Sequence, residues 1–234
     1  MIKFFRKIRQ NLLSEGKTGK YLKYAIGEIA LVVIGILIAL QLNTWKEEIN
    51  AKEELNTSMN LILDDLSQDI AFYNKQIEKI GNRILLLSNF TQGNYSEIDI
   101  EIIPNTVSFN IPNKIYGKTY ISLKEDRQFN MIKNLELRRK ITSYYEVSCE
   151  EYSGIANWHK KFVTETIESY LLLNLPYRRD YKVNAKDVIN DLENGKLLSL
   201  TNYQITMQDW ALVNLKKNKL LAEELSLFIN SEYN

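Results

Sequence analysis

The chain has 234 residues, of which 45% are hydrophobic and 25% charged, with 30 Lys and Arg against 29 Asp and Glu. Its single histidine and single cysteine argue against common zinc sites, a di-iron bundle with paired Glu-x-x-His motifs, a disulfide framework and a CxxC redox centre, because each needs more such residues. We therefore expect no metal and no cofactor. The apolar fraction is typical of one folded domain plus an appendage.

Residues 1–23 form a basic segment with seven basic side chains and one acid, so its net charge is +6 and that of the rest of the chain is −5. The first dozen residues place apolar side chains on one helical face, which predicts a short amphipathic helix in the headgroup layer of a membrane. A topology signal with no further role is the alternative. Nucleic-acid binding is not expected, because the membrane already explains the charge. The basic residues expected at the membrane surface are Lys3, Arg6, Lys7, Arg9, Lys17, Lys20 and Lys23.

The most apolar run of the chain, Ala25 to Leu42, is interrupted only by Glu28 and Gln41. At ~1.5 Å rise per residue, residues 24–45 reach about 30 Å, the thickness of the bilayer core, which predicts one transmembrane helix. Lys and Arg near a span stay on the cytoplasmic side, so we expect the N-terminus inside and the following domain outside. A cleaved signal peptide is the alternative, but its apolar region would be long and no small-x-small cleavage site follows.

One face of this predicted helix combines small and polar residues. At 100° per residue, a stripe about 80° wide contains Glu28, Val32, Gly35, Ala39 and Asn43. Glu28 is close enough to the headgroups to snorkel, which is one interpretation. The other is a packing face for a second copy or another envelope membrane protein, because small residues allow close helix approach and polar groups prefer a protein partner to lipid.

A long helical pattern follows the apolar run, with no proline or glycine between Trp45 and Gly81. Its spacing of threes and fours predicts that the transmembrane helix continues as a stalk into a domain of residues 46–234, with one extra residue in the spacing near Ile70. The apolar stripe is Leu55, Met59, Ile62, Leu66, Ile70, Tyr73, Ile77, Ile80, Ile84 and Leu87.

Residues 91–122 are expected to be irregular, because prolines and glycines punctuate a polar stretch. Ile98, Ile100 and Ile102 alternate with acidic residues in the period of a strand, but no partner strand is evident. The pattern therefore favours an extended loop that packs these isoleucines on the helices.

Helical patterns resume in the second half of the chain, with a long helix over 135–173, a short one over 186–194 stopped by Gly195, and another long one over 202–230. The mostly α fold predicted is a transmembrane helix, a stalk and an elongated antiparallel helical bundle. The face expected to be buried on the first long helix is Ile141, Tyr145, Ser148, Tyr152, Ile155, His159 and Phe162. On the second it is Tyr203, Met207, Trp210, Val213, Leu221, Leu225 and Phe228.

The residues with the most reactive side chains do not suggest a catalytic site. His159 lies on an apolar face, which favours a core histidine satisfied by hydrogen bonds. Cys149 adjoins Glu150 and Glu151, whose charges would raise the pKa of its thiol and disfavour a reactive thiolate. Adjacent acidic pairs diverge by about 100° on a helix and are interpreted as solvated faces. The 14 tyrosines are interpreted as core and groove lining.

The N-terminal sequence resembles that of a family of Bacteroidota single-pass membrane proteins with a signal anchor, catalogued as a domain of unknown function. The resemblance rests on GKTGKYLKYAIGEI from Gly16, VVIGILIALQ from Val32, and Asn43 and Trp45, with weaker similarity around Tyr120, Ile132–Asn134, Leu137–Arg138 and Tyr144–Tyr145. It implies a Gram-negative inner-membrane protein with a periplasmic helical domain. It implies no activity.

The sequence thus favours a membrane-anchored periplasmic interaction protein or accessory subunit without catalytic activity of its own, with the lipid bilayer and a second copy or another envelope membrane protein as partners. The alternative is a ligand-sensing helical bundle that signals through a partner, since 23 cytoplasmic residues cannot hold an output domain.

Overall fold

The computed structural model describes residues 18–233 except 97 and 115, and the side chains of 18–21 and 24 are not part of that description. The amphipathic helix expected in the first dozen residues, and the basic residues up to Lys17, lie outside the described residues. The chain divides into two compact units, Met1–Glu54 and Leu55–Asn234. All regular secondary structure in the described part is helical, so the mostly α prediction is confirmed.

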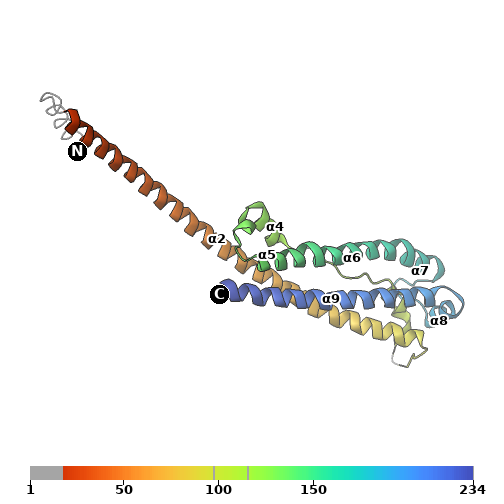
Figure 1. Cartoon of the computed structure of the whole chain (residues 1–234). Coiled ribbons are helices and arrows are strands. Elements are labelled where there is room, and N and C mark those ends of the chain that lie inside the picture. Colours follow the sequence, from red (N-terminus) through yellow and green to blue (C-terminus); the bar gives the residue numbers. More distant parts are fainter. Residues whose placement is uncertain (1–17, 97, 115, 234) are drawn as a thin grey trace. The chain divides into compact units, whose positions relative to one another are not determined.

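Helix α2, Thr18–Thr91, contains the predicted membrane span in the first unit (Figure 1). An apolar window of 18 residues in this helix has a mean hydropathy of 2.4, and none of it is buried. Leu31 and Leu37, for example, are 69% and 58% exposed. By length and composition, the helix is therefore long and apolar enough to cross a membrane.

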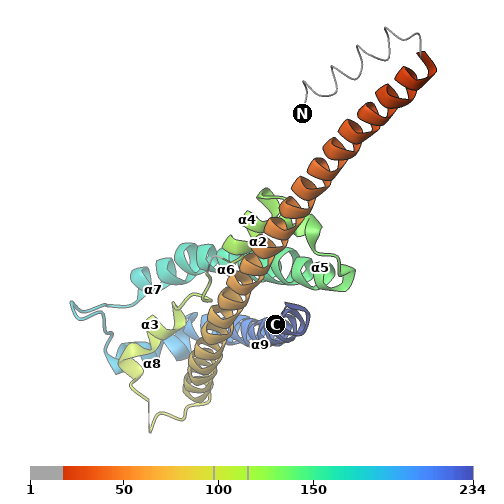
Figure 2. The same ribbon diagram turned by 90° about the vertical axis from the view of Figure 1, so that its left-hand side faces the viewer.

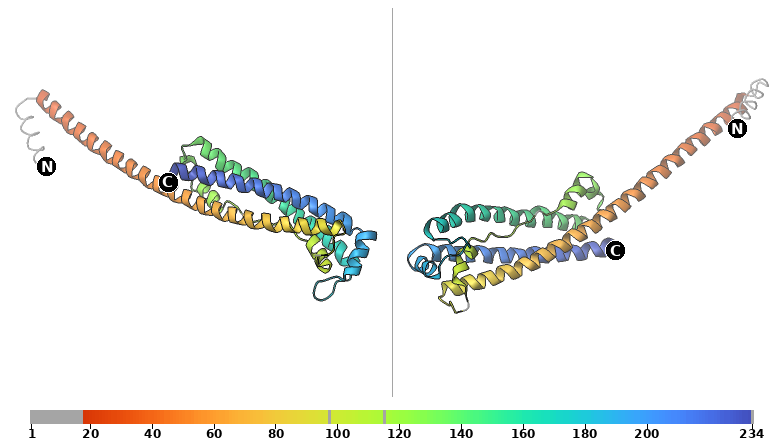
Figure 3. Two further views of the ribbon diagram at one scale, coloured as in Figure 1. Left: turned by 90° about the horizontal axis from the view of Figure 1, so that it is seen from below. Right: turned by 180° about the vertical axis from the view of Figure 1, so that it is seen from behind.

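The second unit is built from three long rods of helix: α2 from Leu55 onward, the run from α5 to α7, and α9 (Figures 1 and 3). Helix α9, Leu197–Tyr233, runs antiparallel to the other two, as expected for an antiparallel bundle. The α2 rod and the α5–α7 run point in the same direction, which departs from that expectation. The reason is that residues 92–134 return along the bundle before α5 begins.

This returning segment contains several short helices: η1 (Ile100–Ile102), α3 (Ile103–Val107), α4 (Lys118–Glu125) and η2 (Gln128–Met131). The part predicted to be irregular, 91–122, therefore includes η1, α3 and the start of α4. Ile98 and Ile100 pack on the core as expected, whereas Ile102 is only partly buried and the neighbouring Ile103 takes the fully buried position. The stretch is also helical at η1 and α3 rather than an extended loop. Figure 2 shows α3 beside α8 (Ala185–Asn194), where the Val183 amide donates to the Glu101 carbonyl at 3.3 Å.

The predicted helix over 135–173 is present, but π-helical segments interrupt it twice. It consists of α5 (Leu135–Thr142), η3 (Ser143–Cys149), α6 (Glu150–Phe162), η4 (Val163–Glu168) and α7 (Ser169–Asn174). A π turn holds more residues than an α turn, so adjacent residues such as Tyr144 and Tyr145 can both be buried. The predicted face is correct at Ile141 through Tyr152 and at His159, whereas Ile155 and Phe162 are only partly buried.

The face predicted for α9 is correct at Leu225, and its partly buried members Met207, Trp210, Leu221 and Phe228 pack against the core from the side. It is wrong at Tyr203 and Val213, which are 37% and 65% exposed, whereas Gln204, next to Tyr203, is buried. The buried stripe of α9 is Leu197, Thr201, Gln204, Gln208, Ala211, Leu215, Asn218, Ala222, Leu225 and Ile229. Helix α8, stopped by Gly195, confirms the short connecting helix.

The core of the second unit has two clusters. The larger one joins α2, α4, the α5–α6 region and the C-terminal half of α9, and the smaller one joins the end of α2 to α3, η4, α7, α8 and the start of α9. The predicted α2 stripe is correct, with Leu55, Met59, Ile62 and Leu66 all at 5% exposure or less. The extra residue near Ile70 has a structural cause, because Asp69 takes the buried position of that turn.

Candidate functional site

His159 is part of the core, as the sequence predicts. Its side chain is fully buried, its Nδ1 accepts a hydrogen bond from the Ile111 amide at 3.2 Å, and its Nε2 lies 2.8 Å from Gln204 Oε1. These partners require a neutral ring protonated on Nε2. Burial lowers the pKa of His159, which favours the same neutral form.

The second unit contains a half-open pocket of about 610 Å³ that could hold a small molecule. It lies between α4, the segment before it, and the η3–α6 region. Its volume is in the range of natural small-molecule sites. The lining residues are Asn113, Lys114, Tyr116, Gly117, Tyr120, Ile121, Lys124, Glu125, Tyr145, Glu146, Cys149, Glu150, Ser153 and Asn157.

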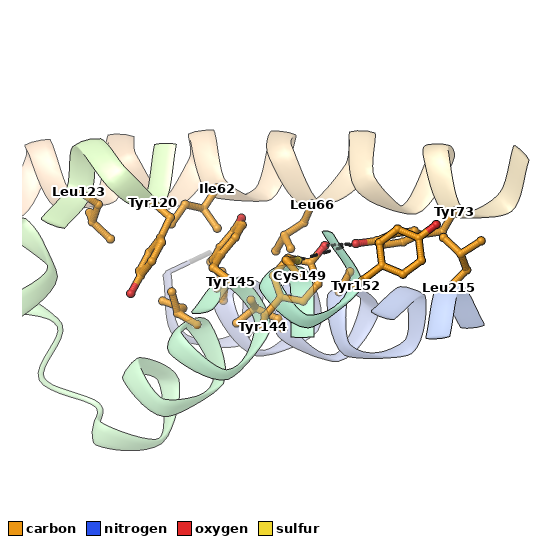
Figure 4. Close-up of a cluster of buried hydrophobic side chains, with 14 of the residues drawn as sticks. Ile62, Leu66, Tyr73, Tyr120, Leu123, Tyr144, Tyr145, Cys149, Tyr152 and Leu215 are labelled. Atoms are coloured by element: carbon orange, nitrogen blue, oxygen red, sulfur yellow. Dashed lines mark hydrogen bonds between the residues drawn. The ribbon is translucent and has the colours of Figure 1, made fainter. Parts of the chain in front are cut away.

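Tyrosine rings form the inner wall of this pocket. Tyr120 of α4 stacks on Tyr145 of η3, with ring centroids 5.0 Å apart and planes within 8° (Figure 4). Gly117 precedes α4 with φ of 73°, and a Cβ atom there would lie 3.0 Å from the Tyr145 ring. Glycine is therefore required at this turn, both for its backbone conformation and for the close approach of the ring.

A buried polar network lies behind the wall and links the pocket to α2. Asp69 is 2% exposed, accepts a hydrogen bond from Tyr144 Oη at 2.7 Å, and forms an ion pair with Lys114, whose side chain lines the pocket. The hydroxyls of Tyr144 and Tyr73 lie 3.0 Å apart and point toward each other in Figure 4. Burial raises the pKa of Asp69, while the hydrogen bonds from Lys114 and Tyr144 oppose that shift.

Cys149 is at the end of this network, with its Sγ 3.9 Å from Tyr73 Oη. The pKa of its thiol is raised to about 12, chiefly by burial and next by the charge of Asp69. The expectation of an unreactive thiol is thus confirmed, but the cause differs from the prediction, since the acidic residues next to it in sequence do not produce the shift.

Charged and amide side chains surround the mouth of the pocket. Glu146 accepts hydrogen bonds from Tyr120 Oη at 2.8 Å and from Lys124 Nζ, and this pairing holds the pKa of Glu146 below its usual value. At the other end, Asn113 Oδ1 accepts from Ser153 Oγ at 3.2 Å and Asn113 Nδ2 donates to Asn157 at 3.3 Å. An arrangement of aromatic wall, charged mouth and fixed amides can orient a polar ligand.

Sequence reasoning did not find this pocket, because its residues come from segments with no common periodicity. Asp69 and Lys114 are 45 residues apart in the chain. The one available signal was the interruption of the α2 stripe near Ile70, which marks the buried carboxylate. The interpretation of the tyrosines as core and groove lining agrees with their positions at Tyr73, Tyr120, Tyr144 and Tyr145.

The proposed transmembrane packing face lies in the first unit and is not brought into contact with a partner in this single chain. Val32 is 57% exposed, and a Cβ atom added to Gly35 would meet nothing within 4 Å. Asn43 Nδ2 donates to Glu47 Oε1 at 2.8 Å, so its amide is already satisfied within the helix. Lys23 is exposed, whereas the side chain of Lys20 lies outside the description.

Within the described residues, no group of three or more His, Cys, Asp or Glu side chains could hold a metal ion. Comparison with known proteins finds no matching family model, no matching curated protein and no matching solved structure.

Proposed function

We propose that this chain is a single-pass protein of a bacterial inner membrane, with its N-terminus in the cytoplasm and its helical domain in the periplasm. In this proposal it acts as an interaction protein or accessory subunit without catalytic activity of its own. The basic segment before the apolar helix supports the orientation, and the resemblance to the Bacteroidota family supports the compartment.

The interaction proposal depends most on where the chemically versatile side chains lie. His159 is held neutral between two hydrogen-bond partners in the core, and the Cys149 thiol has a raised pKa. His159 faces the core rather than the pocket, and Cys149 lines the pocket with a thiol that stays protonated near pH 7, whereas the charged residues of the pocket mouth are accessible. A domain of this kind is suited to binding rather than to bond-making.

Topology is tested by labelling cysteines with a membrane-impermeant reagent in spheroplasts. Ser96 is exposed, so Ser96→Cys should be labelled, whereas Ser14→Cys should be labelled only after lysis. The native cysteine is buried and should stay silent, and Cys149→Ala provides the background. Labelling of Ser14→Cys but not of Ser96→Cys would overturn the orientation.

Partners are tested by purifying the full chain in mild detergent and identifying the proteins that elute with it. Envelope proteins held at a fixed ratio to the chain would support the accessory role. A chain that elutes without other proteins, and whose deletion leaves the amounts of all envelope complexes unchanged, would contradict it.

The pocket favours a second function, a ligand-sensing domain that signals through a partner. Lys114 both lines the pocket and pairs with Asp69 of α2, so a ligand that competes for Lys114 would change a buried charge on that helix. Native mass spectrometry of the purified chain should detect a bound small molecule that Lys124→Ala loses. Lys118→Ala, on the same helix but away from the pocket, is the matched control. A bound mass retained by both variants, or absent from the wild type, would count against this function.

A further inference from the structure

The second unit contains another hollow, of about 310 Å³, beside residues 175–184, which connect α7 to α8 (Figure 1). Its volume is at the lower end of the range for whole small-molecule sites, which suits a single side chain of a partner. Its walls come from the α3 region, from η4 and α7, and from the connection. The lining residues that matter for its chemistry are Glu168, Leu171, Leu172, Tyr177, Arg178 and Tyr181.

A carboxylate without a cation lines this hollow. Glu168 is the last residue of η4 and is half-buried next to the fully buried Ile167, and no ion pair of Glu168 is found in the described part of the chain. The pKa of Tyr177 is raised to about 12, chiefly by burial and next by the charge of Glu168, so the carboxylate lies near this ring. A carboxylate that is partly removed from water favours a cation beside it.

Arg178, which also lines the hollow, is not the counterion of Glu168. Its guanidinium pairs with Glu101 and with Asp180, at 3.0 Å each. Lys182 is likewise taken up, by Asp99 at 3.0 Å and Glu101 at 3.7 Å.

The carboxylates of the hollow and of this ion-pair network outnumber the cations, even when the exposed Arg179 is included. The carboxylates are Asp99, Glu101, Glu168 and Asp180, and the cations are Arg178, Arg179 and Lys182. The surface around the hollow is therefore negative and attracts a partner with a positive group.

The connection that forms the outer wall is held in place by the chain itself. Tyr181 has a φ of 59°, which is uncommon for a residue with a side chain, and its carbonyl accepts a hydrogen bond from Asn105 Nδ2 at 2.7 Å. The Arg178 amide donates to the Lys182 carbonyl at 2.9 Å. Tyr181 and Leu172 are nevertheless 76% and 69% exposed. Because the turn is fixed, a partner that covers these side chains pays less conformational entropy on binding.

We propose that this hollow binds a basic side chain, a lysine or an arginine, of a partner protein. The charged end lies at Glu168, and the aliphatic stem packs against Leu172 and the rings of Tyr177 and Tyr181. Lysine and arginine combine an apolar stem with a charged end, and tyrosine faces attract cations, so this side-chain chemistry matches the lining. The proposal deepens the proposed interaction function by naming the chemistry of the partner, and it rests on that function only for its biological role.

The measurement is the binding of blocked amino acids to the full chain in uncharged detergent micelles, by ligand-observed saturation-transfer NMR. The basic probes are Nα-acetyl-lysine N-methylamide and Nα-acetyl-arginine N-methylamide, and the norleucine equivalent is the uncharged control. We expect at least one basic probe to bind the wild type about tenfold more tightly than the norleucine probe, since a charged hydrogen bond is lost in the control.

Glu168→Gln should remove this preference for the basic probe. Glu165→Gln should keep it, because this matched control removes the same charge from the same π-helical segment but outside the hollow. Tyr181→Leu, at an exposed position, should weaken the basic probe about threefold by removing an aromatic face. Circular dichroism should report the same helix content for each variant.

Four outcomes would each overturn the proposal. They are equal binding of the three probes, a preference for basic probes that persists in Glu168→Gln, a preference lost equally in Glu165→Gln, and binding of free 1,5-diaminopentane about tenfold tighter than that of the blocked lysine, which would assign the hollow to a free amine. Because no other protein is present, these outcomes are independent of whether envelope proteins elute with the chain.

Discussion

The hydrogen bonds of His159 allow a quantitative prediction for the stability of the helical domain. His159→Ala removes the acceptor of the Ile111 amide and the donor to Gln204 Oε1, both of which are buried. An unsatisfied buried polar group costs about 1–3 kcal/mol, and the lost ring adds a cavity. We therefore expect the free energy of unfolding to fall by about 3–5 kcal/mol, against less than about 0.5 kcal/mol for the exposed neighbour in Lys160→Ala.

The same histidine predicts how stability depends on pH. Burial lowers the pKa of His159 below its usual 6.5, so the unfolded chain binds a proton at a pH where the native ring stays neutral. The contribution of the neutral His159 ring to the stability of the fold is therefore complete above pH 6.5. It is lost as the pH falls below 6.5 toward the lowered pKa of the native ring. While the native ring remains neutral, the free energy of unfolding falls by about 1.4 kcal/mol for each pH unit below 6.5.

The assay is urea unfolding of the full chain in detergent between pH 5.5 and 7.5, followed by far-UV circular dichroism. Because the chain has one histidine, His159→Gln removes the whole imidazole contribution, and the difference between the two pH curves isolates it. The reasoning is refuted if the curves are parallel over this range. It is equally refuted if His159→Ala costs less than about 1 kcal/mol.

Three further predictions concern the span, the buried ion pair and the pocket turn. Gly35→Leu should weaken cross-linking of the full chain in its membrane if the packing face is real, whereas Leu37→Phe, on the opposite side of the helix, should leave it unchanged. Lys114→Met should lower the free energy of unfolding by about 2–4 kcal/mol at pH 7, because it leaves the Asp69 carboxylate buried without a cation. The loss should shrink as the pH is lowered to 5, since burial raises the pKa of that carboxyl, and urea unfolding at both pH values checks the sign. Gly117→Ala should cost about 1–2 kcal/mol, measured the same way, because its positive φ and the ring 3.0 Å from the new Cβ both oppose the methyl group.

The apolar stripe of α2 was predictable from the sequence, because large apolar residues recur in helical period over a long stretch without glycine or proline. Asp69 was not, because its counterion Lys114 comes from a segment whose path along the bundle no local pattern describes. The candidate pocket could not be predicted for the same reason. Its wall and mouth come from α4, η3 and the chain before α4, which only the tertiary fold brings together.

The error on α9 has a different cause. The helix is apolar on more than one side, so placing the largest residues inside selects Tyr203 and Trp210 and misses the true stripe by about one residue. The structure instead buries amides whose partners are distant in sequence. Gln204 donates to the Phe109 carbonyl at 2.6 Å, and Asn218 donates to the Ser148 carbonyl at 3.3 Å. A satisfied buried amide can take a core position, but its partner cannot be identified from hydrophobic periodicity.

The π-helical segments make the length of the α5–α7 rod as important as its composition. A π turn contains one residue more than an α turn, so deleting one residue from η3 would let that stretch close into ordinary α-helix and leave α5 and α6 in nearly the same register. The same deletion in α6 before His159 has no π turn to absorb it and would rotate the following residues by about 100°, so His159 could no longer point inward with Tyr145. We therefore expect chains that share this pocket to vary by one residue in η3 while keeping the length of α6 constant.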